Sequence, residues 1–143
     1  MIVLKDEGLY CPEGDFFIDP LLPCKNAVIT HAHADHARPG MKNYICTPET
    51  SEIMKLRISK DLLIKEVEYN NEIQINSVKI TFIPAGHVLG SSQIKIDNGS
   101  EVTIITGDYK RASDPTCKAF EVHECDTFVT EATFASPNFK WPC

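Results

Sequence analysis

The chain has 143 residues, of which 43% are hydrophobic, so it is long enough to form one domain around one core. It carries 20 acidic and 14 basic residues, and the formal charge of −6 excludes a broad basic surface that holds nucleic acid by charge alone. The apolar runs are too short to cross a bilayer and the N-terminus shows no secretory leader, so we expect a cytoplasmic protein without a membrane span.

Short β-type segments dominate the first half of the chain. Phe16–Ile18, Ala27–Ile29 and Tyr44–Cys46 each combine apolar residues with a following turn or capping residue, which predicts short buried strands. The six cysteines of the chain contain no C-x-x-C pair, and we expect them to be reduced thiols.

One helix is clearly indicated. Thr47 suits the N-cap position, a proline follows at the first helical position, and the helix should run to about Arg57. We expect Ile53 and Leu56 to face the core, with Met54 as a further candidate. A second helix could start near His36.

The second half of the chain reads as strands and hairpins. Ile73–Ile75 pairs with Val78–Ile83, and Ile94–Ile96 pairs with Val102–Ile105, because each pair alternates apolar with polar residues around a turn. Phe128–Thr130 is the last predicted strand. These elements predict a layered α/β domain of mostly antiparallel strands with one or two helices.

The chain has only five histidines, and three of them stand together in His31-x-His33-x-Asp35-His36, directly after the predicted strand 27–29. In an extended loop, side chains two residues apart project to the same side, so His31 and His33 can share one metal ion. Asp35 and His36 can then reach a second position beside it. Chance clustering of these residue types is a weak alternative.

Two further candidate ligands follow predicted strands. His87 comes after the strand 78–83 and Asp108 comes after the strand 102–105, and a glycine that allows a sharp turn precedes each of them. The four imidazoles and two carboxylates form a mixed nitrogen and oxygen set suited to Zn²⁺, with Mn²⁺ or Fe as alternatives. Two ions are the natural count, with Asp108 as the bridge. His123 has no such pattern around it and reads as an ordinary histidine.

The motif order, with Gly86-His87 and Gly107-Asp108 after the histidine block, resembles the metallo-β-lactamase superfamily of dinuclear metal hydrolases. The stretches ITHAHADHARPG, YICTPETSEIMKLR, PAGHVLGSSQI, TGDYKRASDPTCKAFE and CDTFVTEATFASP resemble the ligase-associated DNA exonucleases. These belong to the branch that includes RNA 3′-end processing and DNA cross-link repair nucleases. The resemblance runs from about Leu9 to Trp141 and implies the N-terminal half of an αββα sandwich.

The resemblance implies two divalent metal ions and hydrolysis of phosphodiester bonds by a hydroxide held between them. One ion would be held by His31, His33 and His87. The other would be held by Asp35, His36 and the bridging Asp108, and the two carboxylates would also orient the hydroxide.

Four more residues receive roles from the resemblance. Asp19 would support the metal loop without binding the ions, although it could simply cap a turn. Glu131 would orient a general acid, although an ordinary carboxylate at a strand end is the alternative. Lys110 and Arg111 are candidate contacts to substrate phosphates, with a solvated turn as the other interpretation.

The substrate implied by the resemblance is DNA, digested from an end during DNA repair, and an ATP-dependent DNA ligase is the implied partner. An RNA-processing nuclease of the same branch and an inactive metal-binding fragment are the alternatives. Members of the family continue through a cap domain and a C-terminal part that supplies further histidines. We therefore expect residues 1–143 to form a single, truncated domain.

Overall fold

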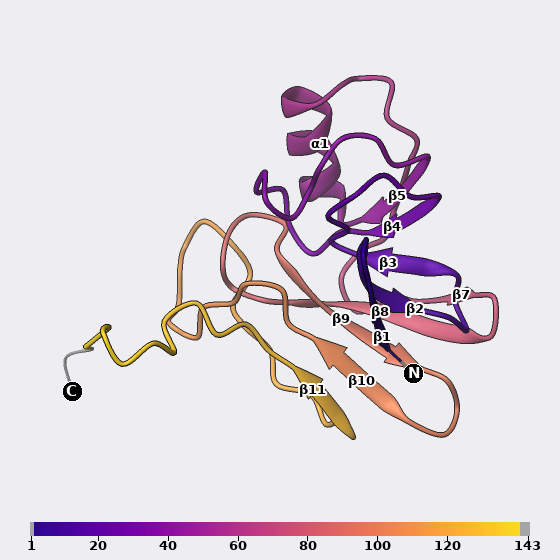
Figure 1. Ribbon diagram of the computed structural model, residues 1–143. Coiled ribbons are helices and arrows are strands. Elements are labelled where there is room, and N and C mark those ends of the chain that lie inside the picture. The colour runs from indigo at the N-terminus through magenta and orange to yellow at the C-terminus, as the bar shows by residue number, and fades with distance from the viewer. Residues whose placement is uncertain (1, 141–143) are drawn as a thin grey trace.

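The strands of this chain assemble into two sheets that pack face to face, as seen in a computed structural model that describes residues 2–140 (Figure 1). The first sheet has the order β1-β2-β3-β4-β5-β6. Its strands are β1 (Val3–Lys5), β2 (Gly8–Cys11), β3 (Phe16–Ile18), β4 (Asn26–Val28), β5 (Asn43–Cys46) and β6 (Ile64–Glu66). β1, β2 and β3 pair antiparallel, whereas β3 to β6 pair in parallel.

The second sheet has the order β11-β10-β9-β8-β7. Its strands are β7 (Glu72–Ile75), β8 (Val78–Pro84), β9 (Ser92–Asp97), β10 (Val102–Ile105) and β11 (Thr127–Val129). All of its pairs are antiparallel except β10 with β11. Both hairpins that the alternating pattern predicts are present.

The main core lies between the two sheets. Phe16 and Ile18 of the first sheet pack into the same cluster as Ile80, Phe82 and Ile94 of the second sheet, and all five are almost completely buried. Each such side chain contributes about 1.5–3 kcal/mol relative to an exposed one. The sheets are therefore held together by apolar contacts on their facing sides.

Helix α1 (Pro48–Arg57) covers the other side of the first sheet, near β4 and β5 (Figure 1). The side chain of Thr47 accepts a hydrogen bond from the backbone N–H of Thr50, as an N-cap should. Met54 is fully buried and Ile53 packs partly against the same cluster, but Leu56 is 88% exposed. The prediction for Leu56 was wrong because two residues turn a helix by about 200°, so Leu56 lies opposite Met54.

The predicted α/β class is confirmed, with one helix and two sheets of mostly antiparallel pairs. A second helix near His36 does not form in the part of the chain that the structure describes. Residues 34–36 make a single turn, in which the N–H of Ala37 bonds the carbonyl of His33 at 2.8 Å. Pro39 and Gly40 follow at once, and both oppose the extension of that turn into a helix.

Five cysteines are free thiols, as expected, and Cys143 lies outside the described residues, as does Trp141. Across residues 2–140, no helix is both long and apolar enough to cross a bilayer.

Candidate metal centre

Five strands end at one edge of the two sheets, and a candidate side chain follows each of them. Asp19 follows β3, residues 31–36 follow β4, His87 follows β8, Asp108 follows β10 and Glu131 follows β11. β3 and β4 are parallel, and β8 and β10 both run antiparallel to β9, so within each sheet these carboxyl ends point the same way. The fold thus brings together loops that are far apart in the sequence.

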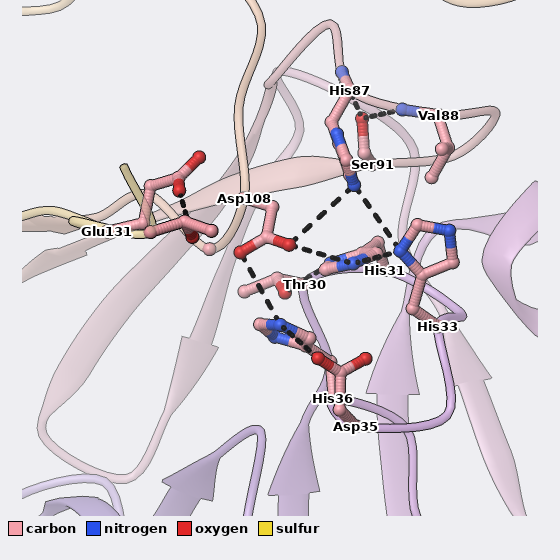
Figure 2. Close-up of polar contacts among 12 residues, drawn as sticks. Thr30, His31, His33, Asp35, His36, His87, Val88, Ser91, Asp108 and Glu131 are labelled. Carbon is pink, nitrogen blue, oxygen red and sulfur yellow. Dashed lines mark hydrogen bonds and ion pairs between the residues drawn. The ribbon is translucent and has the colours of Figure 1, made fainter. Parts of the chain in front are cut away.

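Three histidines and one aspartate form the first group of candidate ligands (Figure 2). Nδ1 of His33 lies 3.0 Å from Nε2 of His31 and 3.3 Å from Nε2 of His87. Oδ2 of Asp108 lies 3.7 Å from Nε2 of His87 and 3.9 Å from Nε2 of His31. All four ligand atoms fall within 4.8 Å of one another, so one metal ion could be held between them.

The other oxygen of Asp108 faces a second group. Oδ1 of Asp108 lies 3.5 Å from Nε2 of His36, and Oδ2 of Asp35 lies 3.6 Å from the same nitrogen (Figure 2). The two oxygens of Asp108 therefore point to different histidines. This is the arrangement that a carboxylate bridging two ions requires.

Asp19 lies behind these ligands and accepts three hydrogen bonds. Its Oδ1 accepts from the backbone N–H of Thr30 at 2.8 Å, and its Oδ2 accepts from the Thr30 hydroxyl at 2.5 Å and from Nδ1 of His36 at 2.7 Å. Asp19, His31 and His36 also lie close enough to form a metal site by distance alone. Both Asp19 oxygens thus accept hydrogen bonds, and one of these bonds holds the ring of His36.

The histidines of the site differ in burial and in the direction in which their pKa values are shifted. His31 is fully buried, and burial together with its neighbouring imidazoles lowers its pKa to about 2, which keeps the ring neutral, as metal binding requires. Burial also lowers the pKa of His87. Burial opposes charge on His36 as well, but the hydrogen bond to Asp19 and the nearby carboxylates outweigh it and raise the pKa of that ring.

The two glycines before candidate ligands are required by space as well as by conformation. Gly107 has φ +55°, and a Cβ there would lie 2.6 Å from Oγ1 of Thr30. Gly86 has φ +71°, and a Cβ there would lie 2.5 Å from the carbonyl oxygen of Lys110. The positive φ at both glycines confirms the expected sharp turns, and the backbone also lies close to its neighbours there.

Glu131 contacts the turn that carries Asp108. Its Oε1 accepts from the backbone N–H of Tyr109 at 3.1 Å, and its Oε2 accepts from the Thr133 hydroxyl at 2.6 Å. Burial works against its charge, but these hydrogen bonds outweigh burial and lower the pKa of the carboxyl. The contact with Tyr109 was not foreseen from the sequence.

The two candidate phosphate contacts differ from each other. Nζ of Lys110 donates to Oδ2 of Asp114 at 3.2 Å and is thus engaged within its own loop. Arg111 is exposed and forms no ion pair with any residue of the range 2–140. His123 pairs with Glu121 at 3.2 Å and is not part of the cluster.

No family model matches this chain. It is 26% identical to the "Probable DNA ligase" of Opitutus terrae over 94% of this chain and 13% of that protein. It is 29% identical to the "Transcription termination factor FttA" of Methanosarcina mazei over 94% of this chain and 26% of that protein. The identity to the "Endoribonuclease ysh1" of Aspergillus fumigatus is 37%, over 50% of this chain and 9% of that protein.

Among solved structures, the chain resembles CmlA, a diiron β-hydroxylase from Streptomyces venezuelae, with a TM-score of 0.56 and 16% identity. That match covers 73% of this chain and 28% of CmlA, and it indicates a shared fold. The chain spans a quarter or less of the length of most of these relatives. Together the matches confirm the resemblance to the nuclease branch of the metallo-β-lactamase superfamily.

Proposed function

We propose that this chain, as a relative of that nuclease branch, is a metal-dependent phosphodiester hydrolase that degrades DNA from an end during DNA repair. The observation that carries the proposal is the convergence of His31, His33, His87 and Asp108 within 4.8 Å, from three separate loops. The similarity to a probable DNA ligase and to an endoribonuclease supports a nucleic-acid substrate. The first of these relatives also supports an ATP-dependent DNA ligase as a partner.

The donor set fits two divalent ions. His31, His33 and His87 would hold one ion, Asp35 and His36 would hold the other, and Asp108 would contribute to both. Imidazole and carboxylate together suit Zn²⁺, with Mn²⁺ or Fe as alternatives. When bound, two such ions lower the pKa of a shared water and neutralise charge on the phosphodiester.

Other residues of the site would orient the attacking water, the metal ligands and the loops that carry them. Asp35 and Asp108 would orient the attacking water, while Asp19 keeps the ring of His36 in place through a 2.7 Å hydrogen bond. Glu131 holds the turn after Asp108 through the N–H of Tyr109. We also propose that Glu131 orients a general acid, the role that the resemblance implies.

Lys110 and Arg111 contact phosphates that flank the bond to be cleaved. Arg111 is the stronger candidate, because its guanidinium is exposed and has no ion pair within residues 2–140. Lys110 would first have to leave Asp114.

The second candidate function is that of an RNA-processing nuclease, which the 37% identity to an endoribonuclease favours. An inactive metal-binding domain is the third. The test is metal analysis of the purified chain, followed by cleavage assays on single- and double-stranded DNA and RNA with Zn²⁺ or Mn²⁺.

The His33→Ala variant removes a ring nitrogen that lies 3.0 Å from His31 and 3.3 Å from His87, so we expect metal and activity to be lost together. The His123→Ala variant is the matched control, because it removes a histidine outside the cluster and should keep both. Metal-dependent cleavage of RNA alone would favour the second candidate. Metal binding without any cleavage would leave the inactive domain.

A further inference from the structure

One buried hydroxyl lies at the centre of the candidate metal centre and has no role in the function proposed above. Thr30 is 1% exposed and lies between β4 and the histidine block. Its Oγ1 lies 2.5 Å from Oδ2 of Asp19 and 3.0 Å from Nδ1 of His31. Its side chain also packs against Gly107, next to Asp108. Thr30 thus contacts Asp19, His31 and the residue that precedes Asp108.

The positions of the protons follow from the number of donors. An ionised carboxylate only accepts, so the single hydroxyl proton of Thr30 must be donated to Asp19. The same oxygen can then only accept from His31, so Nδ1 of His31 must carry a proton. The lone pair of His31 is therefore on Nε2, the atom that faces His33 and Asp108.

The carboxylate of Asp19 also determines which nitrogen of His36 carries a proton. Oδ2 of Asp19 accepts from Nδ1 of His36 at 2.7 Å, so this nitrogen carries a proton as well. Nε2 of His36 is then the atom left to face Asp35 and Asp108. The hydroxyl of Thr30 and the carboxylate of Asp19 thus form one chain of hydrogen bonds that ends on a ligand of each proposed ion.

We propose that Thr30 is a positioning residue that selects the Nδ1–H tautomer of His31. Through Asp19 it also fixes the orientation of the His36 ring. Both metal positions are therefore formed before an ion binds. The inference rests on the proposed metal centre. It goes beyond it, because a single hydroxyl then couples the two positions.

The test compares three variants of the same chain. Thr30→Val keeps the shape and removes the hydroxyl, while Thr30→Ser keeps the hydroxyl. Ser92→Ala is the control for a general loss of hydrogen bonding at this place, because Ser92 donates only to the backbone carbonyl of Thr30, at 2.9 Å. The first measurement is the histidine tautomer in the metal-free protein, from long-range ¹H–¹⁵N NMR spectra at pH 8. The second is a calorimetric titration with zinc ions alone.

We expect the wild type, Thr30→Ser and Ser92→Ala to show the Nδ1–H tautomer of His31. In Thr30→Val the proton should move to Nε2, since Nδ1 of His33, 3.0 Å away, is the partner that remains. Zinc binding of Thr30→Val should weaken by about 10–100-fold at both positions, as for other residues that orient metal ligands. Thr30→Ser and Ser92→Ala should bind zinc as the wild type does.

The inference is overturned if His31 of the wild type carries its proton on Nε2, a result that does not depend on the folding of any variant. It is also overturned if Thr30→Val and Ser92→Ala weaken zinc binding equally, because Thr30 would then have only a structural role. A wild type that binds no zinc but shows the Nδ1–H tautomer would refute the proposed function while keeping the hydrogen-bond chain.

Discussion

The contact between Gly107 and Thr30 makes a prediction whose magnitude can be worked out. Gly107 has φ +55°, in the left-handed region, and a Cβ at this position would lie 2.6 Å from Oγ1 and 2.7 Å from Cβ of Thr30. Thr30 is buried and cannot swing away into solvent. Gly107→Ala therefore combines an unfavourable backbone conformation with a steric overlap.

The two costs can be separated. A left-handed backbone conformation costs a residue with a side chain roughly 1–2 kcal/mol. Forcing an extra carbon into a packed site costs typically about 1–3 kcal/mol more. We expect Gly107→Ala to lower the free energy of unfolding by about 2–5 kcal/mol, and to weaken zinc binding because Asp108 follows directly.

Gly99→Ala is the matched control. Gly99 also has a positive φ, +86°, but it lies in an exposed turn between β9 and β10, where an added Cβ meets nothing within 4 Å. This variant should lose about 1–2 kcal/mol and keep its zinc affinity. Urea unfolding of both variants gives the difference directly, through the midpoints at equal slope. Equal destabilisation of the two variants would refute the steric argument.

Three further predictions concern buried groups. Tyr44→Phe should lower the free energy of unfolding by about 1–3 kcal/mol in urea titrations, because the Tyr44 hydroxyl bonds the Arg38 carbonyl at 2.9 Å and the Met41 N–H at 3.1 Å. Wild-type stability would contradict this. Burial raises the pKa of the Cys46 thiol to about 12, so at pH 8 a thiol reagent followed by mass spectrometry should modify Cys46 only after unfolding. Burial lowers the pKa of His31 from 6.5 to about 2, so between these values the unfolded chain binds a proton that the folded chain does not. The stability of the metal-free protein should therefore fall as the pH drops below about 6.5, and less so in His31→Gln; an unchanged slope in that variant would rule out His31 as the source.

The fold shows where a sequence pattern is sufficient and where it is not. The hairpin β7–β8 was predicted because its apolar residues alternate and one face is buried against the core. β6 was missed, since Ile64–Glu66 has one apolar residue followed by two charged ones. It is a strand because Tyr44, Ile45 and Cys46 of β5 offer a free edge in register with it, a condition that no local pattern encodes.

In the candidate site too, some features follow from the local sequence pattern and others depend on the folded chain. His31, His33 and His36 lie close together in the sequence, and His87 and Asp108 follow strands, so the sequence pattern could identify them. The hydrogen bonds that orient them join residues that are far apart in the sequence. Asp19 and Thr30 are 11 residues apart, and Glu131 reaches Tyr109 over 22 residues. These contacts depend on how the strand ends meet, which only the folded chain defines.

The formal charge of −6 raises the question of how this chain could bind a negatively charged nucleic acid, and the groups around Asp108 bear on the answer. Within residues 2–140, the ion pairs of Asp108 are with His31, His36 and His87, and no lysine or arginine pairs with it. His31 is neutral at physiological pH, and its burial prevents it from balancing a carboxylate. His36, whose pKa the nearby carboxylates raise, is the histidine that can carry a positive charge beside Asp108, and the donor set as a whole suits divalent ions. In the proposed function, removal of bound metal would leave Asp35 and Asp108 with the ring of His36 as the cation that they share. In the proposed function, bound ions would supply most of the positive charge at this edge of a chain whose formal charge is −6, with Lys110 and Arg111 beside them.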